Sequence, residues 1–292
     1  MKYTLLLVLL TSAAYLFSSS FSFFIPNEAI YSLGFSSYNW FGALVYPFLH
    51  ISPIHLISNM LMLLAVGLVV EEKLKWKDYY LIYLVSAVAA GAVFILLVPN
   101  IVLVGASAAI AGFVIPACLI DFKKTVAYLI LFSLIFVAIA GPIQSSILSL
   151  YSQSKEMSTE LEQAYNQTVE QKTQIAQNIS ALDDKFNRGE INITEYNQSR
   201  TGLVTALDNL TEQEQAVSQK LDEATGTVLN LEEGITREQT SQTSLIVHLA
   251  GSFAGLVYLA LFRRDVIWNS GYQVLRLERW LRRRLRRSRK RT

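Results

Sequence analysis

Two residues far apart in the chain, Ser107 and His248, have the side chains needed for nucleophilic chemistry. A serine hydroxyl becomes a nucleophile when a base accepts its proton, and histidine is the side chain best suited to that role near neutral pH. The chain has three histidines, and all lie in or beside apolar sequence: His50 and His55 in HISPIHLISN, and His248 in LIVHLAGSFAGL. Polar side chains are costly in apolar surroundings, so their presence there points to function.

The neighbours of these residues fit the same chemistry. His55 and Asn59 are four residues apart, so one helix face would carry both, and both can donate hydrogen bonds to a developing oxyanion. Ser107 lies in VGASAAIAG, where Gly105, Ala106, Ala108 and Gly112 leave a nearly bare helix face. Gly251 and Gly255 form a second small-residue face after His248. Two such faces allow close helix packing, which we expect to bring Ser107 and His248 within hydrogen-bonding distance.

The elements that must position these groups are apolar. Of the 292 residues, 52% are hydrophobic and 16% charged, which excludes an ordinary soluble domain. Apolar stretches long enough to cross a bilayer as helices occupy 4–24, 52–70, 79–98, 101–120, 125–150 and 243–262. The first could also be a cleaved signal peptide, but its apolar run is long for one, so we expect a retained helix. The sequence therefore predicts an all-α membrane protein with six transmembrane helices.

Charge predicts the orientation of this bundle. Lysines lie at 71–78 and 121–124, and residues 263–292 carry twelve Lys or Arg, whereas none occurs between Lys2 and Lys73. The positive-inside rule then predicts that both termini are cytoplasmic. We expect the protein to lie in the cell membrane. The second, fourth and sixth helices would run inwards. Each carries its polar residues near its start, so we expect His55, Asn59, Ser107 and His248 at one depth near the outer surface.

Residues 151–242 have a different composition. They hold 16 acidic and 7 basic residues and no proline, and their apolar residues keep a heptad spacing in two runs separated by RGEINITEYNQS. This pattern predicts an extracytoplasmic antiparallel coiled-coil hairpin. All five N-x-[ST] sequons of the chain fall in this insert, which makes them candidates for glycosylation: Asn166, Asn178, Asn192, Asn197 and Asn209. We expect Asn192 and Asn197 in the turn and the others off the apolar seam.

The motifs H-x4-H-x3-N, G-x-S and H-x2-G-x3-G, on the second, fourth and sixth helices, resemble those of the rhomboid family of intramembrane serine proteases. The resemblance covers residues 1–150 and 243–262. It implies a six-helix bundle that hydrolyses peptide bonds in or near transmembrane segments of membrane-protein substrates, without a cofactor. Ser107 would be the nucleophile and His248 the general base. His55, Asn59 and the Ser107 backbone N–H would form the oxyanion hole, and His50 would support the loop or cavity.

The sequence departs from the family pattern in three places. Ala108 stands where the family usually has glycine, directly after the serine. The first outer loop lacks the family's common Trp-Arg pair, and Asn39-Trp40-Phe41 is the nearest equivalent. The hairpin replaces a short loop between the fifth and sixth helices. Such an insert could admit substrates, hold an outside partner or pair with a second copy, or it could be a glycosylated stalk without a partner.

Parts of the sequence also fit other functions. Three histidines could bind a metal, but no H-E-x-x-H motif and no intramembrane acid complete a site, so we expect none. A non-catalytic rhomboid-like scaffold or chaperone acting through its coiled coil is the alternative, and the intact pair Ser107 and His248 favours the enzyme. The basic tail 263–292 interleaves Trp and Leu with Arg. Directly after a membrane helix, this pattern favours an amphipathic helix on anionic lipid over a nucleic-acid partner.

Overall fold

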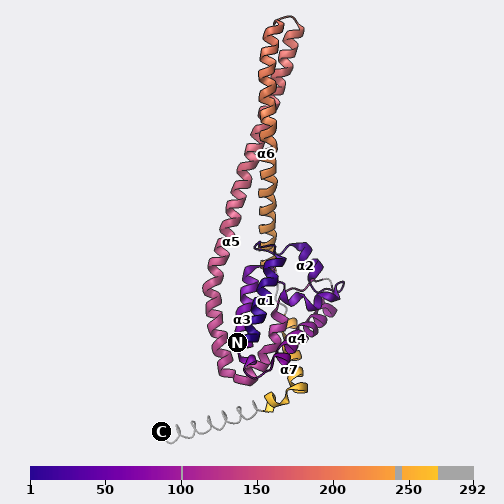
Figure 1. Ribbon diagram of the computed structural model, residues 1–292, viewed down its shortest axis with the longest axis vertical. Helices are drawn as coiled ribbons and strands as arrows, with labels where there is room; N and C mark the ends of the chain where they lie inside the picture. Colours follow the sequence, from indigo (N-terminus) through magenta and orange to yellow (C-terminus); the bar gives the residue numbers. More distant parts are fainter. Residues whose placement is uncertain (100, 241–244, 269–292) are drawn as a thin grey trace. The chain divides into compact units, whose positions relative to one another are not determined.

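The computed structural model describes residues 1–99, 101–240 and 245–268, and the regular elements of this part of the chain are helices joined by loops, without strands (Figure 1). The basic tail beyond residue 268 lies outside the described residues, so the expected lipid-binding helix is not part of the fold below. Seven α-helices and two short 3-10 helices follow in order: α1 (Lys2–Ser18), α2 (Asn27–Leu33), η1 (Trp40–Leu44), η2 (Tyr46–Phe48), α3 (Pro53–Glu71), α4 (Trp76–Leu97), α5 (Ser107–Asn187), α6 (Ile193–Thr240) and α7 (Leu245–Phe262).

Three of these helices, α3, α4 and α5, are long and apolar enough to cross a membrane, and α1 and α7 are shorter apolar helices. Polar backbone groups are satisfied within each helix, which is what a bilayer requires of a spanning segment. The stretch of α5 after Asp121 makes few protein contacts, and apolar side chains there are exposed: Val126, Ile130, Leu131, Leu134 and Val137. Such a surface suits contact with lipid tails.

Two predicted helix boundaries are placed differently by the structure. Apolar sequence continues to Phe24, but α1 ends at Ser18 because Ser20 and Phe21 adopt positive φ angles of 52° and 61°. The predicted helix 101–120 begins only at Ser107. Residues before it run in extended form, where Leu103 exchanges two backbone hydrogen bonds with Phe35 at 3.0 and 2.8 Å.

Helix α5 contains the predicted fourth and fifth spans and one arm of the insert, with a break at Asp121. The φ and ψ of Asp121, −153° and 92°, are extended, so the chain turns there between two helical stretches. Its side chain caps the second stretch, because Oδ1 accepts a hydrogen bond from the backbone N–H of Lys124 at 3.0 Å. Such caps satisfy first-turn N–H groups that have no partner within the helix.

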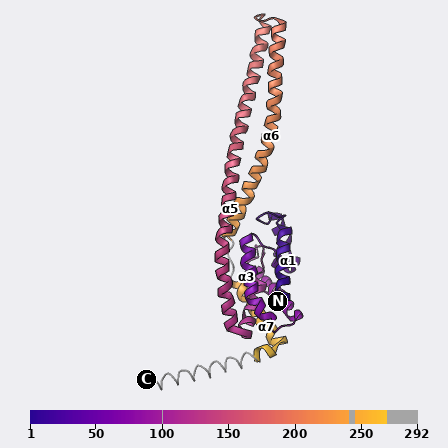
Figure 2. The ribbon, with the colours of Figure 1, turned by 60° about the vertical axis from the view of Figure 1, so that its left-hand side comes forward.

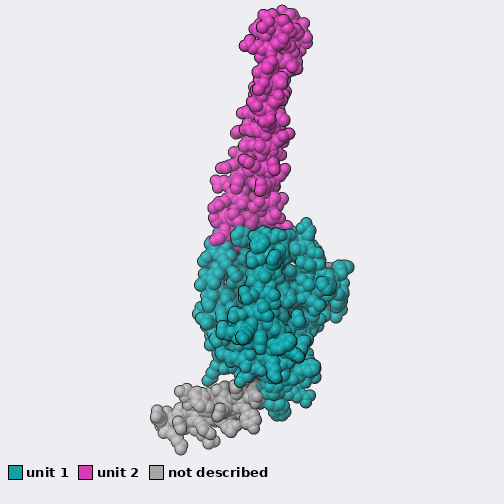
Figure 3. Space-filling model, in the orientation of Figure 1, with its two compact units in different colours: residues 1–145, 234–292 teal, residues 146–233 magenta. Residues whose placement is uncertain are grey.

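The chain forms two compact units, coloured separately in Figure 3: residues 1–145 with 234–292, and residues 146–233. In the first unit α7 packs against α4, and α1 packs against α3. The largest fully buried side chains of this core include Tyr46, Tyr79, Tyr83, Phe35 and Phe113. The second unit contains parts of α5 and α6, which lie side by side in both ribbon views (Figures 1 and 2).

The two helices of the second unit are antiparallel. Ser158 contacts Thr225, Lys172 forms an ion pair with Glu214, and the rings of Phe186 and Tyr196 stack with centroids 4.4 Å apart near the turn. The turn is shorter than the sequence suggested, because α6 already begins at Ile193. Asn192 therefore lies in the turn, where its Oδ1 accepts a hydrogen bond from the N–H of Glu195, whereas Asn197 lies in the helix.

Candidate active site

The loop before Ser107 is held by His50. The backbone N–H of Ala106 donates to Nε2 of His50 at 3.4 Å, and both residues are fully buried. Accepting this bond requires an unprotonated Nε2. Burial, followed by the neighbouring His55, lowers the pKa of His50 to about 3. The imidazole of His50 is therefore neutral near pH 7 and free to accept.

Ser107 is the first residue of α5, so it lies at the helix N-terminus, which carries the positive end of the helix dipole and backbone N–H groups without partners in the helix. The first N–H groups of a helix have no carbonyl partner within it, and together with the dipole they attract negative charge. Ser107 is partly exposed, while Ala106 and Ala108 on either side are buried. This placement leaves the hydroxyl accessible and the backbone fixed, as a nucleophile beside an oxyanion hole requires.

His55 lies against the same loop. A Cβ built on Gly105 would lie 2.8 Å from Cε1 and 2.9 Å from Nε2 of His55, so the imidazole occupies the space left by the missing side chain. The rings of His50 and His55 approach edge to face with centroids 5.0 Å apart. The backbone of His55 is set by Ser52, whose hydroxyl caps α3 by accepting from the N–H of His55 at 3.1 Å.

Asn59 lies one turn after His55 on the same helix, as expected from the spacing. Its side chain is buried, with 6% of its surface exposed, and Nδ2 donates to the carbonyl of His55 at 2.9 Å. An amide nitrogen carries two hydrogens, so this bond leaves one donor for another partner. Asn59 can therefore donate towards a bound group while remaining tethered to its own helix.

Helix α7 packs directly on the start of α5. A Cβ on Gly251 would lie 2.2 Å from the carbonyl oxygen of Ala108, and one on Gly255 would lie 2.0 Å from that of Gly112. Ser252 adds a hydrogen bond from Oγ to the carbonyl of Ala111 at 3.0 Å. Only residues without a side chain allow backbones to approach this closely.

These contacts also set the register of His248. The two glycines of α7 are four residues apart, and so are Ala108 and Gly112, so the helices run in the same direction with matched rise. One turn before Gly251, His248 comes level with the turn from Gly105 to Ser107. The imidazole of His248 is half-buried. Among the described residues no hydrogen bond joins it to the Ser107 hydroxyl; such bonds are often loose before substrate binds.

Ala108 contacts α7 through its backbone. The Ala108 side chain is buried, with 1% of its surface exposed, but the atom nearest to a Cβ on Gly251 is the Ala108 carbonyl oxygen. The extra methyl, relative to the glycine common in the family, therefore coexists with close packing of α5 and α7 at this point.

Sequence reasoning missed the residues that fix the outer loop. The carbonyl of Tyr46 accepts from the N–H of Gly105 at 2.9 Å, and its hydroxyl donates to the carbonyl of Ala87 at 2.7 Å. Asn39 organises η1, since Nδ2 donates to the carbonyls of Ser32 and Gly34 and Oδ1 accepts from the N–H of Gly42. A buried tyrosine and a loop asparagine carry no spacing signal, so only the folded chain reveals these roles.

The C-terminal part of α6 contacts the segment between α1 and α2. Nη1 of Arg237 donates to the carbonyl of Ile25 at 3.0 Å, and the N–H of Ile25 donates to the carbonyl of Ile51, next to His50, at 3.2 Å. A Cβ on Gly234 would lie 2.2 Å from the ring of Phe24. Within the first unit, hydrogen bonds thus connect Arg237 of α6 through Ile25 to Ile51, in the loop segment that carries His50.

The remaining predicted sites are placed as follows. All five sequon asparagines are exposed, so a transferase could reach each of them. Within the described residues, no group of three His, Cys, Asp or Glu side chains lies close enough together to hold a metal ion. Cys118, the single cysteine, lies partly exposed on α5 with a free thiol.

Comparison with protein families matches residues 37–159 to the rhomboid domain. No match was found among curated proteins or among solved structures. The matched range contains the outer loop from Ser37, the helices α3 and α4, and the start of α5 with Ser107, and it ends before α7. With the apolar helices, this rhomboid domain at residues 37–159 indicates a membrane protein.

Proposed function

We propose that the chain is an intramembrane serine protease that hydrolyses peptide bonds in or near the transmembrane segments of membrane proteins. In the proposed reaction Oγ of Ser107 attacks the scissile carbonyl while His248 accepts the hydroxyl proton. His248 then returns that proton to the leaving amine, and water releases the acyl group by the reverse sequence. Negative charge on the tetrahedral oxygen is stabilised by the Ser107 N–H and by donors from His55 and Asn59.

One observation carries the proposal: His55 fills the space beside Gly105, two residues before Ser107, while α7 packs on the first turn of α5. In the proposed site, α3, α5 and α7 would supply a hydroxyl, two imidazoles and helix N–H groups to one region of the first unit. A bundle stabilised by packing alone does not need three polar side chains there, because each carries a desolvation cost.

The remaining architecture follows from this function. We propose six membrane spans, with both termini in the cytoplasm and the second unit outside, forming a coiled coil. Substrates would be other membrane proteins, and the basic tail would bind anionic lipid. The exposed sequons would carry glycans in a host with the transferase. The second unit would bind an outside protein partner or a second copy of the chain, since its helices project a long polar surface.

A serine-reactive fluorophosphonate probe tests the proposal without knowledge of the substrate. We expect the purified protein to be labelled at Ser107, as mapped by mass spectrometry, because a base-activated serine reacts far faster than an ordinary hydroxyl. Ser107→Ala should abolish the labelling, and His248→Ala should reduce it by at least 100-fold, in line with a contribution of about 10²–10⁴ from general base catalysis. Both variants should retain the melting temperature of the wild type within a few degrees.

The matched control is Ser145→Ala, which removes an exposed hydroxyl from the same helix. Its labelling should equal that of the wild type. Labelling that persists in Ser107→Ala, or that is undiminished in His248→Ala, would contradict the dyad. A wild type that is folded but neither labelled nor able to cleave a model transmembrane substrate would instead favour a non-catalytic scaffold.

A further inference from the structure

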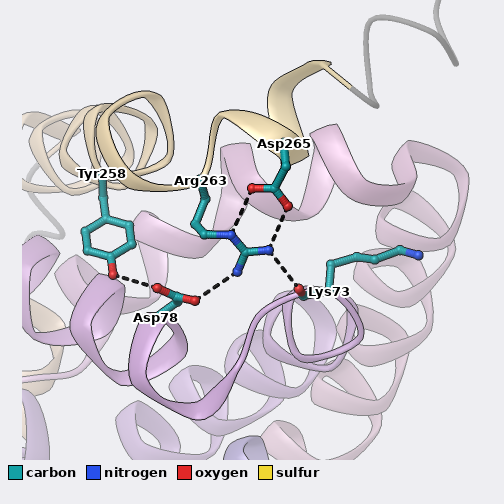
Figure 4. Close-up of polar contacts among 5 residues, drawn as sticks. All are labelled: Lys73, Asp78, Tyr258, Arg263 and Asp265. Atoms are coloured by element: carbon teal, nitrogen blue, oxygen red, sulfur yellow. Dashed lines mark hydrogen bonds and ion pairs between the residues drawn. The ribbon is translucent and has the colours of Figure 1, made fainter.

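The C-terminal end of α7 is joined to the start of α4 through the carboxylate of Asp78 (Figure 4). Oδ2 of Asp78 accepts from Nη1 of Arg263 at 2.9 Å, and Oδ1 accepts from the hydroxyl of Tyr258 at 3.0 Å. Asp78 is the third residue of α4, whereas Tyr258 lies in the last turns of α7 and Arg263 directly follows it. One carboxylate therefore holds α7 at two points.

Arg263 is held from its other side as well. Nε and Nη2 donate to the two oxygens of Asp265 at 2.9 and 2.8 Å, and Nη2 also reaches the carbonyl of Lys73 at 3.3 Å (Figure 4). The side chains of Arg263 and Asp78 are only 19% and 22% exposed. A planar guanidinium in such a fork is fixed in orientation, and partial burial reduces the screening of its charge.

A second surface of α7 meets α5. Where α7 meets α5, the atoms nearest to Gly251 and Gly255 are backbone atoms and the Cβ of Ala111, and the hydroxyl of Ser252 adds one hydrogen bond. Glycine faces permit close approach, but they present no side chain that would interlock and oppose sliding or rotation. The polar contacts at Asp78 are directional, and they join two positions at the C-terminal end of α7 to one residue of α4, against which α7 also packs.

We propose that Arg263 and Asp78 fix the position of α7 along and about its axis, and that Arg263 is thereby a positioning residue for His248. The role assigned to His248 rests on the proposed function. Arg263 follows His248 by fifteen positions, about 22 Å at the helical rise, and a helix transmits a shift at one end to the other. Proton transfer requires the base within about 3 Å of the hydroxyl, so a displacement of about 1 Å at His248 lowers the rate steeply.

The test compares Arg263→Gln and Asp78→Asn with Asp265→Asn. The control removes a carboxylate that also bonds Arg263, but Asp265 lies two residues away on the same segment, and within the described residues its bonds join no second helix. With a model transmembrane substrate, we expect kcat to fall at least fivefold in Arg263→Gln and Asp78→Asn with KM unchanged. Arg263→Lys, which keeps a charge within reach of Asp78, should recover part of kcat, and Asp265→Asn should stay within twofold of the wild type.

A second measurement does not depend on activity. In a Cys118→Ala background, nitroxide labels at the exposed positions Leu97 on α4 and Leu249 on α7 report their separation by double electron–electron resonance. We expect a narrow distance distribution in the wild type and in Asp265→Asn, and a broadened or shifted one in Arg263→Gln and Asp78→Asn. An unchanged distribution in these two variants would overturn the proposal, whether or not kcat falls. A wild type without activity would refute the proposed function, and the distance distributions would still decide whether Arg263 positions α7.

Discussion

The imidazole of His55 lies where a side chain on Gly105 would have to be: a Cβ on Gly105 would come within 2.8 Å of Cε1 of His55. The φ of Gly105, +112°, is also one that residues with a side chain rarely adopt. The loop that leads into Ser107 is therefore shaped by an absent side chain, and His55 on α3 is in register with Ser107 on α5 as a result.

Gly105→Ala should lower probe labelling at Ser107 by at least tenfold while the protein stays folded. The new methyl must displace either His55 or the loop, and the unfavourable φ adds strain of about 1–3 kcal/mol. Labelling rate and melting temperature measure the two effects separately. Gly141→Ala on α5 is the matched control, because nothing lies within 4 Å of a Cβ there. Equal labelling of the two variants would show that contact between His55 and Gly105 is not needed.

The close packing at the glycines of α7 predicts how substitutions there change the stability of the protein. Gly251→Ala and Gly255→Ala should each lower the melting temperature in detergent, because a Cβ would lie 2.2 or 2.0 Å from a carbonyl oxygen of α5. Overpacking of this kind costs about 1–3 kcal/mol. By contrast, Gly202→Ala and Gly226→Ala on α6 have open space around the Cβ. They should stabilise α6 slightly, since alanine is favoured over glycine in a helix by about 1 kcal/mol. A rise in melting temperature for the α7 variants would contradict the close packing.

The rhomboid domain could be predicted from the sequence, because its motifs combine rare polar residues with fixed spacing in apolar helices. The four-residue separation of His55 and Asn59 predicts that they share a helix face, and the glycines at 251 and 255 predict a close helix contact. The hydrogen bond from Ala106 to His50 could not be foreseen, since nothing in the local sequence tells which backbone group a buried histidine will meet. The contact between Asp78 and Arg263 could not be predicted either. Each residue resembles an ordinary charge flanking an apolar helix, and only the fold brings together two residues that are 185 positions apart.

The helix boundaries show the same limit. Residues 101–106 are apolar and read as helix, but pairing of Leu103 with Phe35 draws them into extended form. Propensity is a weak guide where tertiary hydrogen bonds compete with the helix. The polar sequence around Asn197 predicts a turn, but an exposed helix can be equally polar, and Asn197 lies in α6.

His50 predicts a pH dependence of stability. Its folded pKa, about 3, lies below the 6.5 of an unperturbed histidine, chiefly through burial. As pH falls below 6.5 the unfolded chain gains a proton that the folded protein does not bind, so stability is lost progressively between pH about 6.5 and about 3, by up to about 1.4 kcal/mol per pH unit. Above pH 6.5 this contribution is fully present.

The comparison variant is His50→Gln, whose Oε1 can still accept from the N–H of Ala106 but does not titrate. Melting temperature measured from pH 7 to pH 4 should fall less steeply in His50→Gln than in the wild type. Carboxylates elsewhere titrate in both proteins and cancel in the difference. Parallel curves would show that His50 is protonated in the folded protein and that its bond to Ala106 is not maintained.

Shortening the second unit should leave the chemistry at Ser107 intact. Every residue of the proposed site lies in the first unit, and so do Gly234 and Arg237, which contact the outer loop at Phe24 and Ile25. A variant that lacks residues 162–221, closed by a short Gly-Ser turn beyond the contact of Ser158 with Thr225, keeps these contacts. We therefore expect probe labelling within twofold of the wild type, whereas Arg237→Ala should slow labelling because it releases the chain beside Ile51 and His50.

Cleavage of several membrane substrates by the shortened protein then measures substrate selectivity alone. If the second unit binds substrates or their partners, cleavage of some substrates is lost while labelling persists. Loss of labelling in the shortened variant, with Arg237 in place, would show that the distal helices contribute to the site itself.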